Sequence, residues 1–135
     1  MSIPITLMYA SIFALFALVL SFFAGSARGK SGISIGVGEP ANMELLQRVR
    51  VHQNFLEYVP MILIVMGAIE ANGGSSMFLY VVGDLLIIAR IAHAIGLKHD
   101  KMNTKGRLIG AGGTALITLV VAGYGLWLSA NTLLN

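Results

Sequence analysis

Long apolar stretches separated by short polar segments make up most of this chain. They run from about Ile3 to Ala27, Leu45 to Ile69, Met77 to Leu97 and Leu108 to Leu128. An α-helix needs about 20 apolar residues to cross about 30 Å of hydrocarbon, and each stretch reaches that length. The pattern therefore predicts four membrane-spanning helices and leaves no room for a soluble domain.

The composition supports the same fold class. Hydrophobic residues make up 56% of the 135 residues and charged residues 11%, so a soluble domain of this sequence could not cover itself with polar surface. The first stretch lacks a basic leading segment and is longer than the core of a signal peptide, which favours a retained helix. We expect an all-α membrane protein in which residues 1–135 form one four-helix transmembrane bundle.

The basic residues predict an orientation. Loop Lys and Arg residues gather in and after the first loop and around the third, at Arg28, Lys30, Arg48, Arg50, Lys98, Lys101, Lys105 and Arg107. The second loop, residues 70–76, and both ends of the chain have none. The positive-inside rule then places the first and third loops in the cytoplasm and both termini on the other side. In a bacterium, the membrane would be the inner membrane.

A line of polar residues enters the second apolar stretch. Arg50, Asn54 and Glu57 are spaced i, i+4 and i+7, so a helix places a cation, an amide and an anion on one face. Ionisable groups inside a bilayer are costly and usually mark a site. This line suits a small zwitterionic ligand, whereas Arg48 is interpreted as an anchor at the helix end.

Other classes of function are disfavoured by what the sequence contains. The chain has no cysteine, which excludes disulfides, thiolate metal sites and a cysteine nucleophile, and no metal site is expected. The loops account for the net charge of +3, and no basic stripe alternates with aromatic residues, so no nucleic-acid partner is expected. Any thiol chemistry must use the thiol of a substrate.

The motif Arg50-x-x-x-Asn54-x-x-Glu57-Tyr58-x-Pro60, in the second of four helices, resembles the MAPEG family, the membrane-associated proteins in eicosanoid and glutathione metabolism. Two further segments agree, Ser26-Ala27-Arg28 and Arg90-Ile91-Ala92-His93. The family includes microsomal glutathione transferases, leukotriene and prostaglandin synthases and a non-catalytic lipoxygenase-activating protein. The chain is most similar to short bacterial members with an Arg-x-His-x-Asn-x-x-Glu-Tyr core.

This resemblance implies a homotrimer that binds glutathione between subunits, opens to the cytosol and takes a lipophilic substrate from the bilayer lipid. The implied activity is a glutathione-dependent transferase or peroxidase acting on lipophilic electrophiles or lipid hydroperoxides. The implied glutathione contacts are Arg50, Asn54, Glu57, Tyr58, Arg90 and His93 from one subunit, with Arg28 and His52 from its neighbour. Arg107, also from the neighbour, is the implied catalytic residue that stabilises the thiolate, with Lys105 as the competing cation.

The residue types fit that ligand. Arginine pairs with carboxylates in a bidentate manner, and Glu57 suits an ammonium group. A guanidinium beside the sulfur favours the anion of a thiol whose free pKa is about 8.5. One departure stands out, because Leu97 occupies the position where the leukotriene and prostaglandin synthases resemble one another in carrying a tyrosine.

Two other functions remain open. A non-catalytic lipid-binding or scaffold protein of the same fold is the first alternative, although it would be expected to lose the polar line that this chain keeps. A small multidrug exporter is the second, but such exporters resemble one another in a glutamate within the first helix, and residues 1–38 contain no acid.

Several residues also have structural interpretations. Arg90 is expected to be a buried partner of Glu57 or of a backbone carbonyl, and Asp84 to make a helix or subunit contact. The small residues Gly106, Gly110 and Thr114 recur every four positions, which favours close helix packing.

Overall fold

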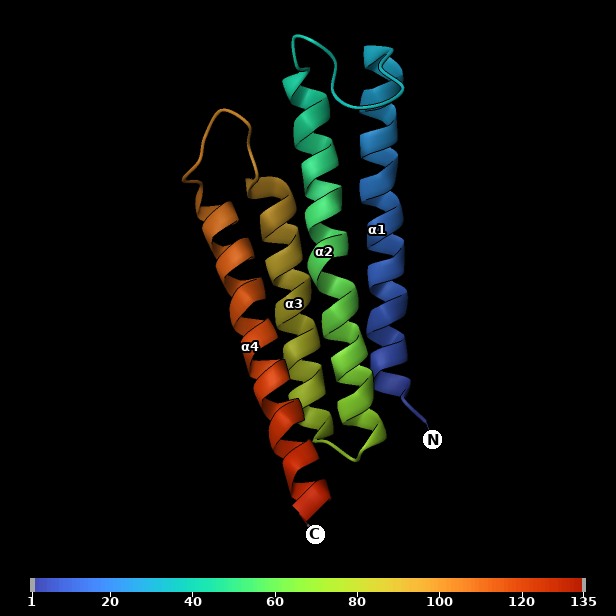
Figure 1. The fold of residues 1–135 in the computed structure, drawn as a ribbon, viewed down its shortest axis with the longest axis vertical. Helices are drawn as coiled ribbons and strands as arrows, with labels where there is room; N and C mark the ends of the chain where they lie inside the picture. Colours follow the sequence, from blue (N-terminus) through green and yellow to red (C-terminus); the bar gives the residue numbers. More distant parts are fainter. Residues whose placement is uncertain (1, 135) are drawn as a thin grey trace.

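The computed structural model describes residues 2–134 as a bundle of four helices (Figure 1). They are α1 (Pro4–Ser31), α2 (Met43–Ala71), α3 (Ser76–Gly96) and α4 (Lys105–Leu134). Each is long and apolar enough to cross a membrane, and no strand occurs within the described range. The predicted all-α, four-helix membrane fold is confirmed. Residues 1 and 135, the outermost positions of the expected domain, lie outside the described range.

The helices run alternately up and down, so the loops separate into two groups. Figure 1 shows the loops α1–α2 and α3–α4 at one end of the bundle, and the short α2–α3 loop together with both ends of the chain at the other. Apart from Arg90, the Lys and Arg residues lie in the α3–α4 loop or toward the ends of α1, α2 and α4 that adjoin the two longer loops. The bundle therefore has one strongly basic end.

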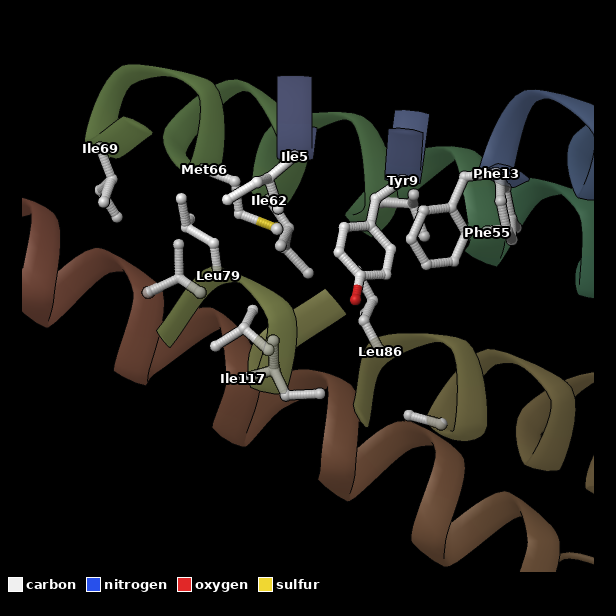
Figure 2. Close-up of a cluster of buried hydrophobic side chains, with 14 of the residues drawn as sticks. Ile5, Tyr9, Phe13, Phe55, Ile62, Met66, Ile69, Leu79, Leu86 and Ile117 are labelled. Atoms are coloured by element: carbon white, nitrogen blue, oxygen red, sulfur yellow. The ribbon is translucent and has the colours of Figure 1, made fainter. Parts of the chain in front are cut away.

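The side chains inside the bundle come from all four helices. Figure 2 shows Tyr9 and Phe13 of α1 beside Phe55 of α2, with Leu86 of α3 and Ile117 of α4 completing the cluster. Large apolar side chains also cover the outside: Leu15, Leu18 and Phe22 are each about two-thirds exposed or more, at 67%, 66% and 70%. Such a surface suits contact with lipid rather than water.

Helices α3 and α4 lie close together because small residues line their contact. A Cβ atom added to Gly96 would collide with the backbone of Gly106, and one added to Gly110 would collide with the backbone of His93. Thr114, one turn beyond Gly110, is buried in the same contact. The expected role of this small-residue series in helix packing is confirmed.

Two carboxylates hold α1 in place near the end opposite the basic loops. The backbone N–H groups of Ile5 and Thr6 donate to the two oxygens of Glu70, at 2.8 and 2.7 Å, so a side chain of α2 caps the start of α1. The Tyr9 hydroxyl lies 2.7 Å from Asp84 Oδ1. Asp84 of α3 thus contacts α1. Of the two expected roles, a helix contact or a subunit contact, the structure shows the helix contact.

Candidate functional site

The polar line of α2 lies on the outer surface of the single chain. Arg50 Nη1 is 3.6 Å from Glu57 Oε1, and each of the two side chains is half exposed. The same nitrogen donates to Gln53 Oε1 at 3.3 Å. Glu57 lies midway between the ends of α2 at Met43 and Ala71. Its charged side chain is therefore exposed on the surface of the single chain at the depth of the lipid hydrocarbon.

A buried guanidinium supports this line from behind. Arg90 of α3 is 2% exposed, and its Nη2 donates to Asn54 Oδ1 at 2.8 Å while its Nη1 donates to Thr114 Oγ1 at 3.2 Å. The guanidinium carbon also lies 5.9 Å from the centroid of the Phe55 ring. Arg90 therefore connects α2, α3 and α4 and fixes the amide of Asn54.

These partners differ from the ones expected for Arg90. Glu57 pairs with Arg50 on its own helix, and Arg90 instead bonds to an amide and a hydroxyl. The physical reason is rotation about the helix axes: Arg90 points into the contact of α2, α3 and α4, whereas Glu57 points outward. Among the described residues, Arg90 Nε is buried without a hydrogen-bond partner.

His93 occupies a buried position one turn along α3 from Arg90. Its side chain is 2% exposed, and it packs where Gly110 of α4 leaves space. Within residues 2–134 its Nδ1 atom has no hydrogen-bond partner. In the single chain His93 therefore lies beneath the surface rather than on the face that carries Arg50 and Glu57.

The remaining site residues lie apart from the polar line or beside it. Arg28 donates to the carbonyls of Ile33 and Gly36, at 3.0 and 3.1 Å, and so braces the α1–α2 loop. Arg107 is half-buried in the first turn of α4, where its Nη1 lies 3.4 Å from Met102 O. His52 is half-buried on α2, and Tyr58 is 43% exposed next to Glu57.

Sequence reasoning missed two partners in this region. Gln53 bonds to Arg50, and its i+3 spacing from that residue was a readable signal. The four-residue spacing indicates Thr114 only as a small packing residue, yet its hydroxyl accepts a hydrogen bond from Arg90. That bond depends on how α3 and α4 are rotated against each other, which no local pattern specifies.

The arrangement offers charges of both signs without a metal. Residues 2–134 bring together no group of three His, Asp or Glu side chains that could hold a metal ion. The open ion pair of Arg50 and Glu57 presents a donor for a carboxylate and an acceptor for an ammonium group, with the Asn54 amide between them. Such a surface can bind a zwitterion by exchanging the internal pair for ligand contacts.

Comparison with known proteins agrees with this layout. The chain is 28% identical over 123 residues to the inner membrane protein YecN of Escherichia coli strain K12, covering 91% of each chain. It matches YecN of the O6:H1 strain CFT073 to the same extent. No solved structure matches significantly. The model of the MAPEG family matches residues 6–127, and this chain therefore belongs to the MAPEG family.

Proposed function

We propose that this protein is a glutathione-dependent transferase or peroxidase of the membrane, which acts on lipophilic electrophiles or lipid hydroperoxides. The observation that carries the proposal is the exposed Arg50–Glu57 pair, whose carboxylate lies midway along a membrane-spanning helix. Charged groups at this depth face a protein interior or a water-filled cavity rather than lipid. A polar ligand site is the simplest reason to keep them there.

The open face also favours an oligomer. The ion pair is half exposed in the single chain and must be shielded from lipid. Neighbouring copies of the same chain would shield it and would enclose a pocket around it. We assign a homotrimer, in which Arg28, His52 and Arg107 of one subunit complete the site of the next. The membership of the MAPEG family supports this assembly and the use of glutathione.

In this pocket the residues divide the work of binding. Arg50 would pair with a carboxylate of glutathione and Glu57 with its ammonium group. Asn54 is held by the Arg90 guanidinium, so its amide meets the ligand in a fixed orientation. Tyr58 and His93 would complete the wall of the pocket.

The chemical step needs the glutathione sulfur as an anion near neutral pH. Arg107 would stabilise that thiolate, because a guanidinium keeps its own proton and acts strongly where little water is present. In a transferase reaction the sulfur forms a bond to the electrophilic carbon while the leaving group departs with the electron pair. In a peroxidase reaction two glutathione molecules become a disulfide, and the hydroperoxide becomes an alcohol and water.

The basic end of the bundle would face the cytoplasm. Both groups of basic loops lie there, and the positive-inside rule then directs the opening of the pocket to cytosolic glutathione. The lipophilic substrate would enter from the side, through the bilayer. An inner membrane location is supported by the E. coli relative, which is an inner membrane protein.

The experiment is a pH titration of thiolate absorbance with bound glutathione, in the parent protein and in Arg107→Ala. The variant should bind glutathione within a few fold of the parent, but the pKa of the bound thiol should rise by at least about 1, equivalent to about 1.4 kcal/mol. Turnover at neutral pH should fall, and higher pH should restore part of it. Identical titrations would remove Arg107 from the mechanism and direct attention to Lys105.

A non-catalytic lipid-binding or scaffold function is the second candidate, and Leu97 favours it. Leu97 directly follows Gly96, the last residue of α3. Related synthases have a tyrosine at the position of Leu97, and its hydroxyl could touch glutathione. A parent protein with no thiolate at any accessible pH and no turnover would support this candidate instead.

A further inference from the structure

A second hollow lies on a different face of the bundle, at its basic end. A groove of about 390 Å³ runs between α1, α2 and α3. Its apolar walls include Phe16, Leu20 and Phe23 of α1 with Ile91 and Ile95 of α3. None of the residues of the polar line contributes to it, so it is separate from the proposed glutathione site.

Two cations stand at the mouth of this groove. Arg48 and Lys98 line it together with Gln47, and no acid is among the described residues that do so. The Arg48 guanidinium carbon lies 5.5 Å from the centroid of the Phe23 ring, which holds the charge over the apolar wall. Gln47 Oε1 accepts a hydrogen bond from the His99 N–H at 2.9 Å, which ties the loop carrying Lys98 to α2.

The groove continues into a polar cleft of about 680 Å³ that shares Gln47, Arg48 and Lys98 with it. Glu44, Asp100 and Lys101 line this cleft but not the groove. The two acids are therefore absent from the groove itself, and three cations of the cleft, Arg48, Lys98 and Lys101, outnumber them. The apolar groove matches the acyl chain of a lipid, and the cations near the membrane surface match its phosphate headgroup.

We propose that this groove binds one anionic phospholipid of the surrounding bilayer, with an acyl chain between α1 and α3 and the phosphate between Arg48 and Lys98. Basic pockets between membrane helices on the cytoplasmic side recognise lipid headgroups in this way. The lipid would also join α1 to α3 on a side where the bundle is hollow. Arg48 then has a defined ligand in addition to its place as a helix-end anchor.

The test is native mass spectrometry of the full-length protein in detergent, with dioleoyl phosphatidylglycerol or dioleoyl phosphatidylcholine added at equal mole fraction. The parent should retain phosphatidylglycerol at least about tenfold more strongly. The double variant Arg48→Gln/Lys98→Gln should lose this preference, because basic residues near the membrane surface attract anionic lipid.

The matched control is Lys30→Gln/Lys105→Gln, which removes the same charge from the same end of the bundle without touching the groove. It should keep the preference of the parent. Equal losses in both double variants would overturn the proposal in favour of overall charge, and an unchanged preference in Arg48→Gln/Lys98→Gln would overturn it as well.

A last arm separates a lipid from a free anion. Millimolar inorganic phosphate should leave the phosphatidylglycerol bound, because the acyl chain supplies much of the contact. Displacement by phosphate would show that the site binds only an anion and would refute the proposal that the groove binds an acyl chain. Ala94→Phe fills the apolar wall while keeping both cations, and it should weaken retention at least several-fold. Circular dichroism establishes that each variant keeps its helices, and a folded Ala94→Phe protein that binds like the parent would also contradict the proposal.

Discussion

The hydrogen bonds of Arg90 can be tested directly, because its partner Thr114 can be replaced by a residue of nearly the same shape. Thr114→Val replaces a hydroxyl by a methyl group of nearly the same size and removes the acceptor 3.2 Å from Arg90 Nη1. Thr118→Val is the matched control. Each hydroxyl donates to the carbonyl four residues earlier, at 2.7 and 2.8 Å, and of these two threonines it is Thr114 that accepts a hydrogen bond from Arg90.

The expected magnitude follows from the type of bond. A hydrogen bond to a charged group contributes about 1.5 to 3 kcal/mol in soluble proteins, whereas bonds between membrane helices average about 0.6 kcal/mol and reach about 1.7. A buried, charge-assisted bond of 3.2 Å belongs toward the upper part of the membrane range. Thr114→Val should therefore lower the free energy of unfolding by about 1 kcal/mol more than Thr118→Val does.

The assay is reversible unfolding in mixed detergent micelles with increasing dodecyl sulfate, followed by the loss of helical circular dichroism. Asn54→Ala, which removes the acceptor at 2.8 Å, should cost as much as Thr114→Val or more. If Thr114→Val and Thr118→Val unfold alike within about 0.3 kcal/mol, the Arg90–Thr114 bond does not stabilise the bundle, and the anchoring of Arg90 by α4 would be refuted.

Two other outcomes are expected. Reporter fusions after the C-terminus and in the 72–75 loop should both report the non-cytoplasmic side, because the loop cations lie at the opposite end; a cytoplasmic C-terminus would reverse the placement of the site. Tyr9→Phe should lower the free energy of unfolding by about 1 kcal/mol, because it leaves Asp84 without its 2.7 Å donor. Tyr80→Phe, whose ring lies edge-on to Tyr9, is the control for the loss of a hydroxyl, and equal stability of the two variants would argue against the Tyr9–Asp84 bond.

The number and positions of the helices could be predicted because apolar length alone decides which segments can cross a bilayer. Their ends could not be predicted as well. Helix α1 continues past Ala27 to Ser31, since Arg28 and Lys30 continue the helix although they end the apolar run. Helix α4 likewise extends six residues beyond Leu128, to Leu134.

The site was predictable where its contacts stay within one helix. The spacing of Arg50, Asn54 and Glu57 placed them on one face, and the structure joins Arg50 to Glu57 there. The partners of Arg90 required knowledge of how three helices are rotated against one another, and the periodicity of a single helix contains no such information. The open face of α2 was also invisible in the sequence, because it depends on which sides α1, α3 and α4 leave uncovered.

Isothermal titration calorimetry of glutathione into the detergent-purified protein tests the central proposal most directly. The parent should bind, and Glu57→Gln, which keeps the shape but removes the charge, should bind roughly 30-fold more weakly, equivalent to about 2 kcal/mol for an ammonium group left unpaired. Glu44→Gln, an acid-to-amide change in the first turn of the same helix, should bind like the parent. Equal affinity in Glu57→Gln and the parent, or no binding by the parent at millimolar glutathione, would contradict the assignment of the polar line as the glutathione site.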